Sequence, residues 1–153
     1  MRIEVFNNQK SQALSLRAVK AVVKAVIAFE GQCCDEVTLH FVETEEICRL
    51  HEQFFGDPTT TDCISFPMDD CEDGIGPFVL GEIFICPVTA IEYAKTHHGD
   101  SGHECTLYIV HGLLHLMGYD DIEDADIIEM RAAEERHMQN LKQLNLILQH
   151  RAK

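Results

Sequence analysis

The chain has 153 residues, of which 26 are acidic and 12 are Lys or Arg, so its formal net charge is −14. A chain of this length is expected to form one domain, over residues 1–153, with a core large enough to need no disulfide or metal staple. It contains no apolar run long enough to cross a membrane, and its acidic balance argues against general affinity for nucleic acid, which comes largely from Lys and Arg.

Periodicity and turn signals predict nine elements. In chain order they are a strand over residues 2–6, a helix over 14–29, a strand over 36–42, a helix over 44–55, strands over 63–66 and 79–86, and helices over 87–97, 104–117 and 125–148. Asp124 is the expected cap of the last helix, and an acidic loop is expected over 69–77. This order predicts an α/β fold (α+β-type) in which about five helices pack with a single mixed four-stranded sheet.

The first predicted helix has an apolar side and a basic side. The apolar residues expected to face the core are Leu16, Val19, Val23, Val26 and Ile27. The basic residues that share one helix face are Arg17, Lys20 and Lys24. A solvated helix face is the simplest interpretation of this stripe, although any contact with RNA would have to use such a local feature because the whole chain is acidic.

Two features predict a cytoplasmic protein. The chain starts without the basic segment and apolar run of a secretory signal. Its seven cysteines are an odd number and include no C-x-x-C pair. This pattern suits a reducing compartment, in which thiols serve as small buried apolar groups.

Residues 111–121 carry a metal-binding pattern. His111 and His115 are four residues apart on a predicted helix, which places their Cβ atoms about 6 Å apart and lets two imidazoles bind one ion. Gly118 is expected to turn the chain back towards the helix. Asp121 is then the predicted third ligand, with Asp120 as the next candidate. Two imidazoles, one carboxylate and an open position are typical of a catalytic site for Zn²⁺ or a similar ion.

The same stretch resembles the signature His-Gly-x-x-His-x-x-Gly-Tyr-Asp-x of the YbeY endoribonucleases. Two more blocks are similar to this family and follow the same order, namely Thr-Asp-Cys-Ile-Ser-Phe-Pro over residues 61–67 and Leu-Gly-Glu-Ile-Phe-Ile over 80–85. Met130 and Glu134 fall where the family has a Met and a Glu. The resemblance therefore extends over roughly residues 45–135.

The resemblance implies a metal-dependent, single-strand-specific endoribonuclease that matures the 3′ end of small-subunit ribosomal RNA and takes part in ribosome quality control. It implies one Zn²⁺ per chain, or another divalent transition metal such as Ni²⁺. The implied partners are single-stranded RNA, a small-subunit ribosomal protein and an Era-like GTPase, with no membrane. Ser65 is implied to line the RNA groove, while Cys63 is either a further metal ligand or, more simply, a buried apolar group.

Two positions depart from the family pattern. Asp121 stands where the family usually has a third histidine, and its negative charge lowers the Lewis acidity of a bound ion. Phe55 stands where the family has an arginine before a glycine. An arginine could bind phosphate through a forked pair of hydrogen bonds, whereas phenylalanine can only stack on a base. Both departures predict weaker RNA cleavage.

Two other functions fit parts of the pattern. The ligand spacing also occurs in metzincin metalloproteases, but those enzymes place a glutamate after the first histidine, and this chain has Gly112 there. A non-catalytic ribosome-assembly module with a retained metal would suit Phe55 and the acidic charge. The remaining histidine cluster, His97, His98 and His103, is expected to be solvated.

Overall fold

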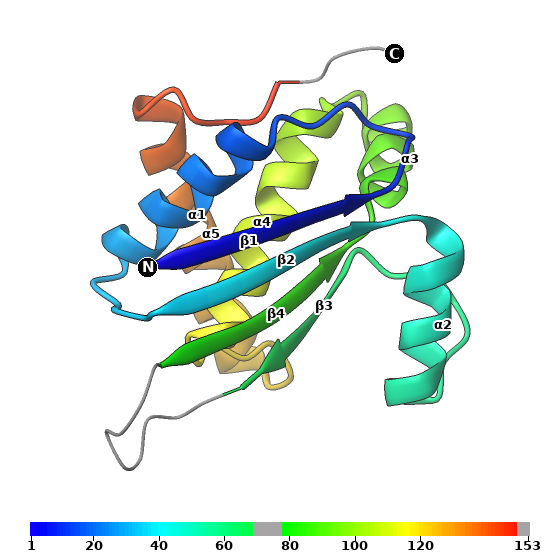
Figure 1. Ribbon diagram of the computed structural model, residues 1–153, viewed down its shortest axis with the longest axis horizontal. Coiled ribbons are helices and arrows are strands. Elements are labelled where there is room, and N and C mark those ends of the chain that lie inside the picture. The colour runs from blue at the N-terminus through cyan, green and yellow to red at the C-terminus, as the bar shows by residue number, and fades with distance from the viewer. Residues whose placement is uncertain (69–77, 150–153) are drawn as a thin grey trace.

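The computed structural model describes residues 1–68 and 78–149, so the loop predicted over 69–77 lies outside the described residues. Its elements follow the predicted order (Figure 1). They are β1 (Arg2–Asn8), α1 (Leu16–Phe29), β2 (Glu36–Val42), α2 (Thr44–Phe55), β3 (Cys63–Pro67), β4 (Val79–Ile85), α3 (Pro87–His97), α4 (Ser101–Leu116) and α5 (Asp124–Gln143). The predicted α/β class is confirmed.

The four strands form one mixed sheet in the order β1-β2-β4-β3. β1, β2 and β4 are parallel, whereas β3 pairs with β4 in the antiparallel direction. Leu39 of β2 lies between Val5 of β1 and Ile83 of β4 in the register. The alternation of buried and half-buried residues along β2 shows that one face of this strand packs on the core.

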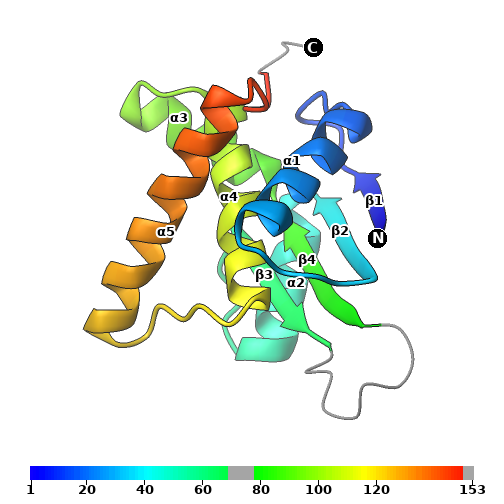
Figure 2. The same cartoon turned by 90° about the vertical axis from the view of Figure 1, so that its left-hand side faces the viewer.

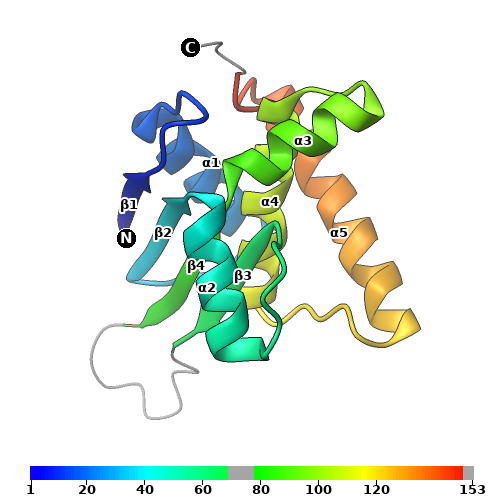
Figure 3. The same cartoon turned by 90° about the vertical axis from the view of Figure 1, so that its right-hand side faces the viewer.

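Helices α1 and α4 pack on that face of the sheet, and α5 packs on the outside of α4 (Figure 2). Helix α2 lies beside the edge strand β3 (Figure 3). The buried residues of α1 are Val19, Val22, Val23, Val26 and Ile27. The prediction for Leu16 was wrong, because this first helical residue is 41% exposed and the buried stripe begins one turn later.

Two helix boundaries differ from the prediction. Helix α4 begins at Ser101 rather than at residue 104, because the side chain of Asp100 accepts a hydrogen bond from the His103 amide and caps it. Helix α5 ends at Gln143 rather than at residue 148. Asn145 adopts a left-handed conformation with φ of 59°, which ends the helix. Residue Glu123, not Asp124, occupies the N-cap of α5.

Gly112 brings α4 close to the sheet. A Cβ atom at this position would lie 2.8 Å from Cγ2 of Ile83, so no other residue fits without a shift. The hydroxyl of Ser65 on β3 donates a hydrogen bond of 3.2 Å to the Gly112 carbonyl. This close approach holds the second half of α4 against β3 and β4, next to the two predicted histidine ligands.

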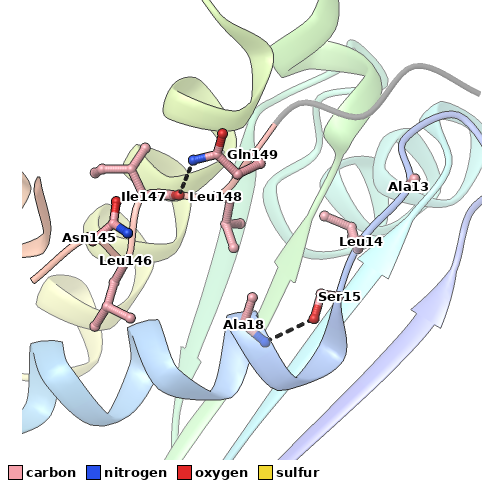
Figure 4. A pocket seen from close by; sticks show the side chains of 9 residues that line it. All are labelled: Ala13, Leu14, Ser15, Ala18, Asn145, Leu146, Ile147, Leu148 and Gln149. Carbon is pink, nitrogen blue, oxygen red and sulfur yellow. Dashed lines mark hydrogen bonds between the residues drawn. The ribbon is translucent and has the colours of Figure 1, made fainter.

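None of the helices within residues 1–68 and 78–149 is long and apolar enough to cross a membrane. The six cysteines in these ranges are free thiols. A cavity of about 590 Å³ lies between the start of α1 and the segment that follows α5 (Figure 4). Its lining consists of apolar side chains and the uncharged Ser15, Asn145 and Gln149, so it offers no acid, base or metal ligand.

Candidate metal centre

The last two turns of α4 and the following loop bring three candidate ligands together. His111 Nε2 and His115 Nε2 are 3.0 Å apart. The Asp121 Oδ2 atom is 3.5 Å from each of them. The four-residue helical spacing aligns the two imidazoles, and Gly118, with φ of 102°, turns the chain so that Asp121 returns to them.

These separations suit a tetrahedral ion. Zn²⁺ binds His nitrogen and carboxylate oxygen at about 2.0–2.2 Å, which places tetrahedral ligands about 3.3–3.5 Å from one another. The measured edges of 3.0, 3.5 and 3.5 Å are close to those values. The three side chains are half-buried, and no other group of His, Cys, Asp and Glu within the described ranges has this arrangement.

Both imidazoles are oriented through their other nitrogen. His111 Nδ1 lies 2.8 Å from Glu134 Oε2, and His115 Nδ1 lies 3.1 Å from the carbonyl oxygen of Tyr119. A carbonyl can only accept, so His115 Nδ1 must carry a proton, and a neutral ring then directs the lone pair of Nε2 towards His111 and Asp121. Three acceptor atoms that face one another in this way favour a bound cation.

Glu134 links His111 to a nearby arginine. It is almost fully buried on α5 and accepts hydrogen bonds from both His111 and Arg131. Although burial opposes its ionisation, those two partners hold the pKa of its carboxyl below the ordinary value. Burial likewise lowers the pKa of His111, but Glu134, with the charges of Asp62 and Asp121, raises it overall.

Glu134 was identified in the sequence only through the family resemblance, and its contact with His111 was not predicted. The sequence could have shown that Glu134 is buried, because it lies four residues after Met130 and therefore on the same face of α5. A buried acid requires a partner, and the only way to find His111 as that partner is to know how α5 packs on α4.

A second network holds the loop that carries Asp121. The hydroxyl of Tyr119 donates to the carboxylate of Glu30, 3.2 Å away at the end of α1. The same carboxylate is 3.0 Å from Nε2 of His137, which is fully buried on α5. Since the Tyr119 carbonyl accepts from His115, this network connects α1 and α5 to a predicted ligand.

The candidate ligands face a cavity of about 370 Å³. Phe55, at the end of α2 and 60% exposed, also lines this cavity. Ser65 and Cys63 of β3 also line it, but Cys63 is not part of the ligand group. Burial and the nearby charges of Asp62, Asp121 and Glu134 raise the pKa of its thiol well above the ordinary value, so this cysteine stays protonated.

The other candidates are not brought into the cluster. Asp120 lines the cavity, but its carboxylate accepts from the backbone amide of Asp121 at 2.8 Å, and it is absent from the ligand group of the described residues. His97, His98 and His103 are exposed near the start of α4, as expected. His97 stacks on Tyr93, with the two ring centroids 3.9 Å apart.

Two imidazoles and a carboxylate that converge on an open cavity in an α/β fold are the arrangement of metal-dependent hydrolases. Residues 4–142 match the family described as endoribonuclease YbeY. A relative from Protochlamydia amoebophila, named endoribonuclease YbeY, is 54% identical over 147 residues, which cover 95% of this chain and 97% of the relative. The chain therefore belongs to the YbeY endoribonuclease family.

Other relatives agree with this assignment. A protein named endoribonuclease YbeY from Chlamydia felis is 31% identical over 151 residues, which cover 97% of this chain and 96% of the relative. The solution structure of a Thermotoga maritima protein has a TM-score of 0.65, 24% sequence identity, and coverage of 94% of this chain and 91% of that one. At that identity, the likeness concerns the fold alone.

Proposed function

We propose that the chain is a metal-dependent endoribonuclease that cleaves single-stranded RNA, with His111, His115 and Asp121 as its metal ligands. Family membership supports the endoribonuclease activity. The observation that carries the metal dependence is the convergence of two Nε2 atoms and one carboxylate oxygen, with both Nδ1 atoms held by other acceptors. The whole chain, residues 1–153, is proposed to act as one catalytic domain.

Zn²⁺ is the proposed ion because two imidazoles and one carboxylate lie at tetrahedral separations. Ni²⁺ is the next candidate because imidazole is also a good ligand for it. A divalent ion bound there supplies Lewis-acid polarisation of a phosphate and an activated water. Glu134 and the Tyr119 carbonyl accept from the two Nδ1 atoms, so that both Nε2 lone pairs would be available to an ion.

The cavity offers RNA two kinds of contact. Phe55 is exposed at its wall and provides an aromatic face on which an unpaired base can stack. Thr61 also lines the cavity; its hydroxyl donates to Asp62 at 3.3 Å, so its oxygen can accept a hydrogen bond from a ribose 2′-hydroxyl. Stacking requires a base that is free of a duplex, which supports a preference for single-stranded RNA.

The biological setting follows from the family resemblance. The proposed substrate is the 3′ end of small-subunit ribosomal RNA in the cytoplasm, with ribosome quality control as the wider process. A small-subunit ribosomal protein and an Era-like GTPase are the proposed protein partners. The proposed substrate, process and partners are supported by family membership and not by the geometry of the metal centre.

Metalloprotease activity is disfavoured by the packing of Gly112. A glutamate at this position would serve as the general base, but a Cβ atom there already meets Ile83 at 2.8 Å and the Ser65 hydroxyl at 3.3 Å. The chain therefore has neither the required carboxylate nor the space for it, whereas hydrolysis of RNA does not depend on that residue.

The test measures metal content and cleavage together. Purified protein is analysed for bound metal and then incubated with a single-stranded RNA that ends in the small-subunit 3′ sequence, and with the same sequence as a duplex. We expect one ion per chain and cleavage of the single strand that a chelator abolishes and Zn²⁺ or Ni²⁺ restores. Bound metal without cleavage of any RNA would instead support the non-catalytic assembly module.

A further inference from the structure

An acidic protein that binds RNA needs a cation close to its active site. The position at which the family has an arginine is occupied by Phe55, which carries no charge. Among the arginines in residues 1–68 and 78–149, Arg131 shares a carboxylate partner, Glu134, with the predicted ligand His111. Glu134 accepts from Arg131 Nη1 at 2.6 Å and from His111 Nδ1 at 2.8 Å.

The guanidinium of Arg131 has one edge free for a ligand. Both of its hydrogen bonds to Glu134, at 2.6 and 3.2 Å, use the same nitrogen, Nη1. Nε and Nη2 have no hydrogen-bond partner in the described part of the chain, and the side chain is 66% exposed. Nε–H and Nη2–H form the fork that binds two oxygens of a phosphate at once.

Arg131 also lies within reach of the metal centre. Nη1 of Arg131 lies 3.2 Å from Glu134 Oε2, which lies 2.8 Å from His111 Nδ1. With the width of the imidazole ring and one metal–nitrogen bond added, Nη1 is within about 10 Å of any ion bound to His111 Nε2. The hydrogen bond to Glu134 and the charge of that residue, with smaller effects of Asp121 and Asp62, raise the pKa of Arg131, so the guanidinium stays charged.

Two other arginines, Arg49 and Arg136, already bind protein groups with Nη2. Arg49 uses Nε and Nη2 on Glu46 and Nη1 on Gln53, so its Nε–Nη2 edge is already bound to a carboxylate. Arg136 Nη2 is directed at the Tyr119 hydroxyl, 3.4 Å away, and at Glu30. Arg131 therefore combines a free fork with a direct link to the predicted ligands.

We infer that Arg131 of α5 binds a backbone phosphate of the RNA strand held at the metal centre. This inference rests on the proposed function, because it assumes that the cavity binds RNA. It places the phosphate contact on α5, whereas the family pattern predicts it at the end of α2. Glu134 positions the arginine by binding Nη1 and leaves Nε and Nη2 available to a phosphate.

The experiment measures RNA affinity separately from catalysis. Fluorescence anisotropy of a labelled single-stranded RNA is followed over a series of salt concentrations, with metal-free protein in chelator, for the wild type, Arg131→Gln and Arg131→Lys. Lys142→Gln is the control, because it removes one exposed positive charge from the same helix about 16 Å further along. Metal affinity and melting temperature are measured for each variant.

We expect Arg131→Gln to bind RNA about tenfold more weakly at low salt. The slope of log affinity against log salt concentration should also be smaller by about 0.7, the value for one phosphate contact on a single strand. Arg131→Lys should be intermediate, because it keeps the charge and loses the fork. In steady-state cleavage, KM should rise more than kcat falls. Lys142→Gln should match the wild type.

If Arg131 serves only to neutralise Glu134, the variants should behave differently. Arg131→Gln would then lower metal affinity or melting temperature and leave the RNA affinity and the salt slope unchanged, which would overturn the inference. If the wild type cleaves RNA and Arg131→Gln binds it equally well, only the inference fails. If the wild type neither binds nor cleaves single-stranded RNA, the proposed function fails with it.

Discussion

Histidines lie at both ends of helix α4, and only those at one end face each other. Near its start, His97 bonds to a carbonyl of its own helix and His98 adopts the left-handed conformation that ends α3. Near its end, His111 and His115 lie with their Nε2 atoms 3.0 Å apart. The residue type is the same at both ends, but the surroundings differ.

The difference lies in what binds the second ring nitrogen. His97 Nδ1 is satisfied locally, four residues back in its own helix, so that its ring orientation is independent of other elements. His111 Nδ1 binds Glu134 of α5, and His115 Nδ1 binds a carbonyl that follows the helix. A histidine becomes a candidate ligand when other parts of the fold orient its free nitrogen.

Removing the two imidazoles at the end of α4 is expected to have the largest effect. His111→Ala combined with His115→Ala should abolish stoichiometric metal binding and RNA cleavage, because two of three ligands are lost. The matched variant, His97→Ala with His98→Ala, should keep both. Elemental analysis and a cleavage assay measure these outcomes, and retained metal in the first variant would show that the site lies elsewhere.

The two neighbouring aspartates provide the next test. Asp121→Ala should lower metal affinity by more than about 100-fold, since a ligand should matter more than an outer-shell partner, and Asp121→His should be tolerated. Asp120→Ala should have little effect, because its carboxylate bonds to the Asp121 amide. Competition with a chelating dye measures both, and the opposite ranking would identify Asp120 as the ligand.

The contact between α4 and α5 can be tested at Glu134. Glu134→Gln keeps the shape but removes the charge that orients His111, so metal affinity should fall about 10–100-fold. Glu129→Gln is the control, because this acid is exposed on the same helix and is not one of the residues of the candidate metal centre. Equal affinity in both variants would mean that His111 is oriented without help from α5.

A smaller effect is expected at the loop that carries Asp121. Tyr119→Phe removes the hydroxyl that binds Glu30 and keeps the carbonyl that binds His115, so metal affinity should fall about threefold to tenfold. Tyr93→Phe, near the other end of α4, should leave the affinity unchanged. Isothermal titration with Zn²⁺ resolves this range, and an unchanged Tyr119→Phe variant would restrict the Glu30 network to folding stability.

The smallest effect is a gain at the cavity wall. Phe55→Arg, alone or with Asp121→His, should raise RNA affinity a few-fold and make metal-dependent cleavage fall more steeply with salt, because it adds a phosphate contact. Phe54→Arg adds the same charge at the next residue, which does not line the cavity, and should have less effect. Assays at low and moderate salt distinguish the two, since screening acts over about 10 Å at 0.1 M. If Phe54→Arg gives the same gain, the effect is one of net charge alone.

The order and type of all nine elements could be predicted from the sequence, because the spacing of apolar residues reports which face of a helix or strand is buried. The ends of the helices were harder to predict. Leu146 and Leu148 continue the apolar pattern past Gln143, so the pattern alone extends the last helix. Asn145 stops it through a left-handed backbone conformation that periodicity does not record.

The candidate site shows the same division. The pairing of His111 with His115 and the turn at Gly118 are local in the chain, so the sequence by itself determined them through the geometry of one helix. Arg131 and Glu134 are three residues apart on α5, so their ion pair is also local. Glu134 lies 23 residues after His111, and whether it reaches that ring depends on how α5 packs on α4. Only the tertiary structure decided the contact between Glu134 and His111, because side chains on separate helices meet through packing and not through spacing along the chain.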